Sequence, residues 1–128
     1  MRGVGKVETR TARVELLEQG IVVARIGDQL QTLADAQENL AACARLAEPD
    51  RKPLLVDIRG ARPLVPEVRH YYTGGHLDAP FAAFGLLVRG SPVGQMMGNF
   101  YLRVARPGIP ARMFSDEPKA VKWLRARK

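Results

Sequence analysis

Short apolar runs recur along this chain, and most are followed by a stretch with helical spacing. Residues 12–18 alternate polar and apolar positions, and residues 21–26 (IVVARI) form a second, more apolar run. The short connection at Gly20 contains glycine and favours an antiparallel hairpin between them. Three later runs predict further strands, at residues 53–57, 82–88 and 111–114.

The first predicted helix lies between the hairpin and the third strand. Thr32 is a good N-cap, and Asp35, three residues on, can bond back to the Thr32 amide as in a capping box. Pro49 ends the helix, and Cys43, beside its apolar stripe, is interpreted as a packing residue. The expected stripe consists of Leu33, Ala36, Leu40 and Ala44. A short second helix is expected from Pro66.

The stretch from residue 86 to 112 reads as a strand, a capped helix and the next strand. Ser91 is a suitable N-cap, and Pro92 follows at the first helical position, where its missing N–H costs nothing. Gly94 and Gly98 lie four residues apart, so one side of this helix can approach a sheet closely. The apolar stripe of this helix is expected to contain Val93, Met97, Phe100 and Val104.

The order of elements predicts an α/β fold. A last helix is expected after Ser115, which would cap it. Strands that alternate with helices indicate a mixed, mainly parallel sheet with an N-terminal antiparallel hairpin and helices packed on it. Residues 1–10 are rich in glycine and charge and are expected to form a flexible tail. Residues 11–128 are expected to form a single domain.

Composition narrows the class of protein. The chain has 128 residues, no apolar run long enough to cross a membrane, and no apolar segment typical of a signal peptide. Its single cysteine excludes an internal disulfide, so we expect a cytoplasmic protein. The 20 Lys and Arg residues outnumber 13 Asp and Glu residues and favour an acidic partner, but they are scattered, so we do not expect nucleic acid.

The candidate chemistry lies where the parallel strands end. In open α/β sheets, ligands bind outside the carboxyl ends of these strands. Asp57 and Arg59 follow the third strand, and Arg89 with Ser91 follows the fourth. Ser115 follows the fifth. Arg89 beside a helix N-terminus could hold a phosphate or carboxylate. The alternative is that the serines only cap helices and that Arg59 pairs with Asp57.

No motif indicates catalysis or a bound metal. Ser91, His70 and Asp57 can be assembled on paper into a triad, but no nucleophile elbow supports it. No spacing of His or Cys is typical of metal ligands, and no cofactor is expected. Tyr71 and Tyr72, with His70, form an amphipathic aromatic patch that is a candidate partner-facing surface. The alternative is that they form a half-buried helix face.

The order of elements resembles the SpoIIAA-like proteins of the STAS/Sec14-like group. The resemblance covers about residues 11–126, and it is carried by PLLVDIRG at the third strand and by VRGSPVGQMMGNFYLRVARPGIPARMFSDEPKAVKWL in the C-terminal part. It implies the STAS-like fold. Members that antagonise anti-sigma factors bind a kinase-like partner and are phosphorylated on a serine at the start of the helix after the third strand.

This chain departs from the family's pattern at that serine. The matching stretch, residues 64–68, reads LVPEV and contains no Ser or Thr. We therefore expect a regulatory, protein-binding module without the usual phosphoacceptor, which acts through a protein partner or as a homo-oligomer. The alternatives are a domain that binds a small anion or nucleotide at the carboxyl edge, and an enzyme such as a hydrolase.

Overall fold

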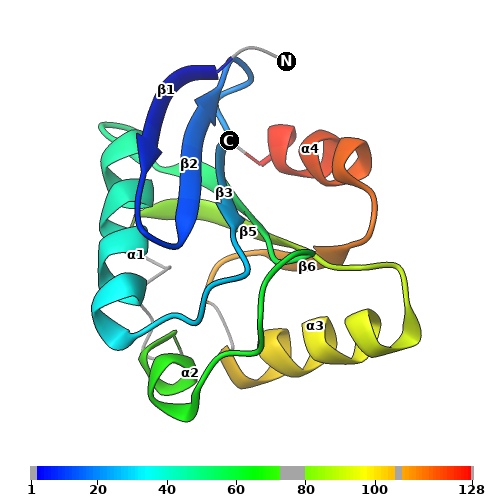
Figure 1. The fold of residues 1–128 in the computed structure, drawn as a ribbon. Helices are drawn as coiled ribbons and strands as arrows, with labels where there is room; N and C mark the ends of the chain where they lie inside the picture. The colour runs from blue at the N-terminus through cyan, green and yellow to red at the C-terminus, as the bar shows by residue number, and fades with distance from the viewer. Residues whose placement is uncertain (1–2, 73–79, 106–107, 128) are drawn as a thin grey trace.

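The computed structural model describes residues 3–72, 80–105 and 108–127, and within them six strands form one sheet on which four helices pack (Figure 1). The strand order in the sheet follows the chain. The strands are β1 (Gly3–Glu8), β2 (Ala12–Leu17), β3 (Val22–Ile26), β4 (Lys52–Asp57), β5 (Phe81–Leu87) and β6 (Ala111–Phe114). The helices are α1 (Leu33–Ala47), α2 (Pro66–Tyr72), α3 (Pro92–Ala105) and α4 (Glu117–Arg125).

The pairing of the strands confirms the predicted fold class. β1, β2 and β3 pair in antiparallel fashion, while β3, β4, β5 and β6 pair in parallel. The sheet is therefore mixed, with an antiparallel hairpin at the N-terminus and parallel strands after it. Each parallel step is made through a helix, as the alternation in the sequence predicts.

The prediction of a flexible tail over residues 1–10 is wrong for β1, because Gly3–Glu8 is the edge strand of the sheet. Composition alone does not reveal two contacts that β1 makes with the rest of the protein. Opposite charges face each other in register with β2, where Lys6 lies opposite Glu15. The strand also runs close to α1, since a Cβ at Gly5 would lie 3.3 Å from Cδ2 of Leu46.

Side chains of the sheet alternate between two apolar layers. One layer joins Val14, Val22 and Leu54 to the buried face of α1. The other joins Val23 and Leu55 to α4. α3 packs on the same side as α1, so α4 alone among the described helices covers the opposite face (Figure 1).

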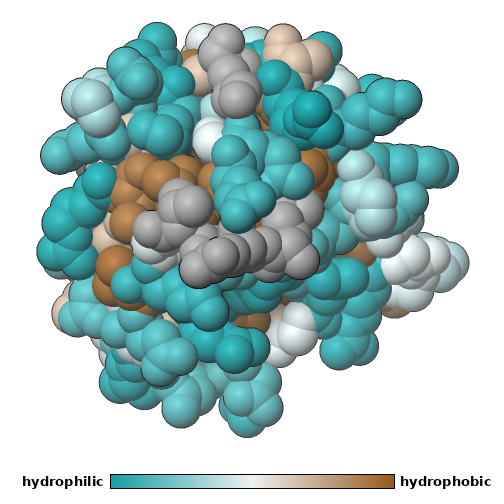
Figure 2. Space-filling view, turned by 90° about the horizontal axis from the view of Figure 1, so that it is seen from above, coloured by the Kyte–Doolittle hydropathy of each residue, from teal (hydrophilic) through white to brown (hydrophobic). Residues whose placement is uncertain are grey.

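The two layers do not cover the sheet equally. α1 packs over β2, β3 and β4, whereas α4 packs mainly over β4, β5 and β6. The α4 side of β1 and β2 carries charged side chains instead of a comparable helix. Seen from above, the surface is predominantly hydrophilic, with hydrophobic atoms in small separate groups (Figure 2). The charged residues on this side of the hairpin are Lys6, Glu8, Arg13 and Glu15.

Two of the three predicted helix caps are confirmed. The Asp35 amide donates to Thr32 Oγ1 at 3.2 Å, and the Thr32 amide donates to Asp35 Oδ2 at 2.9 Å, which completes a capping box. The Gly94 amide donates to Ser91 Oγ at 3.1 Å.

The cap predicted at Ser115 is wrong. Asp116 is the N-cap of α4, and its side chain makes no capping hydrogen bond. Pro118 occupies the second helical position and has no N–H, so one of the donors that a cap would satisfy is missing.

The buried face of α1 is turned relative to the predicted stripe. Ala36 and Cys43 are buried, but Leu33 and Leu40 are only half-buried and Asn39 is buried in their place. Asn39 is drawn inward because its Nδ2 donates to Thr11 Oγ1 at 2.8 Å. The interpretation of Cys43 as a packing residue is confirmed, and burial raises the pKa of its thiol to about 12.

α3 approaches the sheet through glycine, as predicted. A Cβ at Gly98 would lie 2.2 Å from Met113 Sδ and 2.9 Å from Val88 Cγ1. Val93 was expected in the buried stripe but is 64% exposed. It lies about 140° around the helix from Gly98, so it points away when the glycine faces the sheet. Met97, Phe100 and Val104 complete the predicted stripe, and their side chains lie outside the part of the protein that the structure describes.

We expect Gly98→Leu to destabilise the protein by about 1–3 kcal/mol, because the new side chain must displace Met113 and Val88. The measurement is urea denaturation monitored by circular dichroism. Gly90→Ala is the control, since a Cβ there would only contact Ser115 Cβ at 3.8 Å. An unchanged midpoint for Gly98→Leu would show that α3 does not pack through its glycine side.

Candidate functional site

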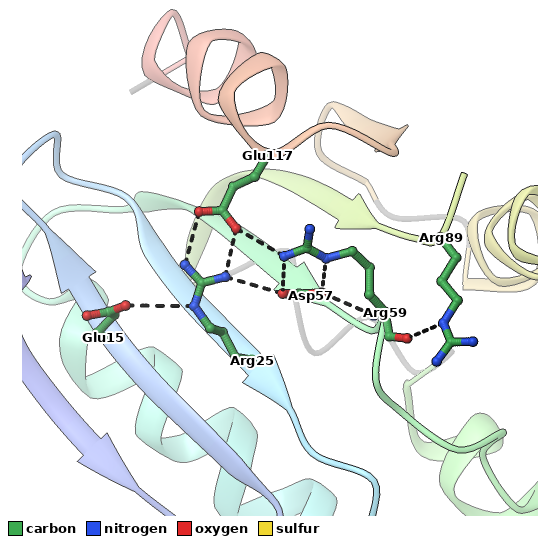
Figure 3. A network of polar contacts seen from close by, with 6 residues as sticks. All are labelled: Glu15, Arg25, Asp57, Arg59, Arg89 and Glu117. Atoms are coloured by element: carbon green, nitrogen blue, oxygen red, sulfur yellow. Dashed lines mark hydrogen bonds and ion pairs between the residues drawn. The ribbon is translucent and has the colours of Figure 1, made fainter. Parts of the chain in front are cut away.

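Polar side chains gather where β3 and β4 end and where α4 begins. Arg25 is on β3, Asp57 is the last residue of β4, and Glu117 is the first residue of α4 (Figure 3). Arg25 and Asp57 are direct neighbours in the parallel register. Together with Arg59, just after β4, these side chains form a continuous network at the carboxyl edge of the parallel strands.

Arg25 bridges the sheet and α4. Its guanidinium donates two hydrogen bonds to the Glu117 carboxylate, at 2.7 and 3.0 Å, in the bidentate geometry of a strong charge-assisted contact. It also donates to Asp57 Oδ2 at 3.2 Å, and its Nε lies 3.9 Å from Glu15 Oε1. One cation therefore contacts carboxylates from β2, β4 and α4.

Arg59 closes the network from the other side. Its Nε and Nη2 donate to the two oxygens of Asp57, at 3.0 and 2.9 Å, and its amide donates to Oδ1 at 3.1 Å. Nη2 also lies 3.3 Å from Glu117 Oε1. Arg59 thus pairs with Asp57, which is the alternative that the sequence left open.

The network keeps both carboxylates charged. Burial alone would raise the pKa of Asp57, but the hydrogen bonds from Arg59 and the charges of Arg59 and Arg25 outweigh it, so the pKa is lowered. The hydrogen bonds from Arg25 lower the pKa of Glu117 against a smaller opposing effect of burial. Hydrogen bonding to Glu117 raises the pKa of Arg25 as well. All these groups are ionised at neutral pH.

The other predicted residues of this edge lie around the network. Arg89 follows β5, and its Nε donates to the carbonyl oxygen of Arg59 at 2.6 Å (Figure 3). Ser91 Oγ accepts the capping bond from Gly94. Ser115 is exposed and follows β6. Several of the hydrogen-bond donors that we expected to bind an anion, in Arg59 and Arg89, therefore donate to groups within the protein.

His70 and Tyr71 lie on α2, away from the elements that build the network. Tyr71 packs edge to face against Tyr72 at a centroid distance of 5.5 Å, and Tyr72 OH lies 3.5 Å from Gln31 Oε1. Asp57 accepts its hydrogen bonds from Arg59 and Arg25, and Ser91 Oγ accepts one from the Gly94 amide, so these contacts of the two residues do not involve His70.

Sequence reasoning missed Arg25, Glu117 and Glu15. The signal for Arg25 was available, since it is the one charged residue inside the apolar run IVVARI. Its partner Glu117 gives no such signal, because an acid in the first turn of a helix is already favoured by the helix dipole. Finding the network from sequence requires the register between β3 and β4 and the placement of α4, which local patterns do not contain.

Within residues 3–72, 80–105 and 108–127, no cluster of three or more His, Cys, Asp and Glu side chains could hold a metal ion. In the same part of the chain, no helix is both long and apolar enough to cross a membrane.

A family model described as "Domain of unknown function (DUF7793)" matches residues 16–128. The chain belongs to this family. Its matched region takes in every element from β3 to α4, and with them Arg25, Asp57, Arg59 and Glu117. No curated protein matches the chain.

Two solved structures are similar to this member of the DUF7793 family. One is an uncharacterised protein of the DUF3478 family from Shewanella loihica PV-4, with a SpoIIAA-like fold. It is 15% identical, with a TM-score of 0.56 over 94% of this chain and 90% of the other. The likeness shows that the fold is SpoIIAA-like. The other, a protein with unknown function from Arthrobacter sp. FB24, is 26% identical and has a TM-score of 0.33, over 87% of this chain and 96% of the other.

We expect Glu117→Gln to lower the free energy of unfolding at neutral pH by about 1–2 kcal/mol, because neutral Gln holds Arg25 less strongly. The pKa of Glu117 in the folded protein lies below its ordinary value of 4.5, so its stabilising contribution is complete above that pH. It is lost as the pH falls further. The difference between wild type and Glu117→Gln should therefore shrink between pH 7 and pH 3.

The measurement is urea denaturation at several pH values. Glu18→Gln is the matched control, since Glu18 is an exposed carboxylate without an ion pair among the described residues. If the free energy of unfolding of Glu117→Gln depends on pH as steeply as that of the wild type, the stabilising role assigned to the ionised Glu117 is wrong.

Proposed function

We propose that this protein is a non-enzymatic, regulatory module that binds a protein partner. The SpoIIAA-like fold supports the class of module. The observation that carries the proposal is on α3, where Val93 is 64% and Met96 is 67% exposed. They lie three residues apart, so they are neighbours on one side of the helix.

The surroundings of these two side chains suit an apolar contact. Pro92 and Ser91 beside them are exposed, and the only charged residue in the stretch LVRGSPVGQMMGNF is Arg89. Gly94 and Gly98 occupy the side of α3 turned to the protein, so the exposed pair is not needed for packing on the sheet. Met is adaptable at binding surfaces. We infer a partner that presents apolar side chains to this part of α3.

The state of the carboxyl edge favours binding over catalysis. Asp57 and Glu117 are fixed as charged partners of arginines, and a general acid or base would need a pKa near neutrality instead. Arg59 likewise directs its donors to these carboxylates. A small anion would have to compete with them, which makes the anion-binding alternative the weaker proposal.

We expect Val93→Ser combined with Met96→Gln to abolish partner binding without unfolding the protein, because both side chains are exposed and their removal deprives the contact of its apolar area. The measurement is capture from the native cell with tagged full-length protein, with and without nuclease, read by mass spectrometry. Sedimentation of the purified protein, alone and with the captured partner, gives the stoichiometry.

Leu30→Gln is the matched control, because Leu30 is the other large apolar side chain exposed among the described residues, at 51%, and lies outside α3. A partner kept by wild type and Leu30→Gln but lost by the double variant supports the proposal. Self-association lost in the same pattern identifies a second copy as the partner. A monomer without such a partner, or partners that the double variant retains, would overturn it.

A further inference from the structure

The excess positive charge of this protein is most evident on α4. Lys119, Lys122 and Arg125 are exposed along this helix. None of them takes part in the ion pairs found among the described residues. Their positive charges are thus not compensated by an ion pair, in contrast to those of Arg25 on β3 and Arg59 after β4, which pair with Glu117 at the start of α4.

The electrostatics of the helix itself accounts for only part of this arrangement. Cations are favourable in the last turn of a helix, and Lys122 and Arg125 both fit that rule. Lys119 does not, because it lies in the first turn, where the helix dipole disfavours positive charge. All three cations are exposed on the outer side of α4, where a partner of opposite charge can reach them.

An open groove runs along the flank of α4 beside these cations. Its volume is about 380 Å³, within the range of ligand pockets. All the residues that line it belong to α4. The exposed Pro118 provides most of the apolar lining, because Val121 at its base is only 7% exposed, and Lys122 and Arg125 provide positive charge. Glu117 also lines it, but the carboxylate of Glu117 is neutralised by Arg25 and Arg59. The groove therefore combines an apolar lining with a net positive charge.

We propose that this groove binds a short acidic segment of a protein partner. Carboxylates of the segment pair with Lys122 and Arg125, and an apolar side chain between them contacts Pro118. This surface is separate from the exposed pair on α3, since α3 and α4 lie on opposite sides of the sheet (Figure 1). The inference therefore goes beyond the function proposed above and does not depend on it.

The shape of the site favours a peptide over nucleic acid. Lys119 and Arg125 are six residues apart on one helix, which is about 9 Å, so only two or three phosphates could be reached. On α4 itself, the described aromatic ring is that of Trp123, which packs against Phe114 at a centroid distance of 5.6 Å and carries Arg127 at 3.8 Å over its ring, so it is already in use within the protein. Stacking platforms are typical of single-strand binding.

The test is fluorescence anisotropy of the full-length protein with a labelled peptide of alternating Glu and Leu. Charge reversal in Lys122→Glu with Arg125→Glu is expected to weaken binding by roughly tenfold or more. The control is Arg45→Glu with Arg62→Glu, which changes the net charge equally at exposed positions away from α4. Val93→Ser with Met96→Gln should leave peptide binding unchanged, which separates this proposal from the previous one.

Three results would overturn the proposal. The first is that the wild type binds the peptide no better than a version of the peptide with Gln for Glu. The second is that both charge reversals weaken peptide binding equally. The third is that an oligonucleotide of the same charge binds as tightly as the peptide. Thermal unfolding monitored by circular dichroism checks that each variant is folded. If the charge reversal on α4 unfolds the protein, Lys122→Gln with Arg125→Gln takes its place, with Arg45→Gln and Arg62→Gln as control.

Discussion

The bidentate contact between Arg25 and Glu117 joins α4 to the sheet, and α4 alone among the described helices covers its side of the sheet. A charged side chain at the end of a buried strand needs partners, and the parallel register supplies Asp57 directly beside Arg25. Arg59 then shares both carboxylates and balances the charge. The position of the apolar layer beneath α4 depends on this closed set of ion pairs.

The same network occupies the carboxyl edge of the parallel strands. Open α/β sheets commonly bind ligands there, since loops and helix N-termini converge at this edge. Here the converging groups satisfy one another, and arginines hold the pKa values of Asp57 and Glu117 below their ordinary ranges. The edge is thereby an element of stability. This is the physical reason for placing the proposed functions on outer surfaces of the helices.

Those two surfaces differ in chemistry as well as in place. The exposed part of α3 is apolar and nearly uncharged, whereas the groove on α4 is cationic with an apolar lining. The sheet separates them. The exposed pair on α3 lies outside the core, whereas the groove on α4 borders the core at Val121. A module with two such surfaces would be able to hold two different segments at once, which is a suitable geometry for a regulatory protein.

Local pattern determined most of the architecture. Apolar runs and caps at Thr32 and Ser91 predicted the alternation of elements and hence the mixed sheet, because these signals act over a few residues. They failed where distant contacts prevail. β1 exists because it pairs with β2, and Asn39 is buried because Thr11 bonds it. The sequence alone placed Asp57 and Arg59 at the carboxyl edge, but only the tertiary structure brought in Arg25 and Glu117. Partners so far apart in the chain meet through strand register and helix placement, which no local pattern encodes.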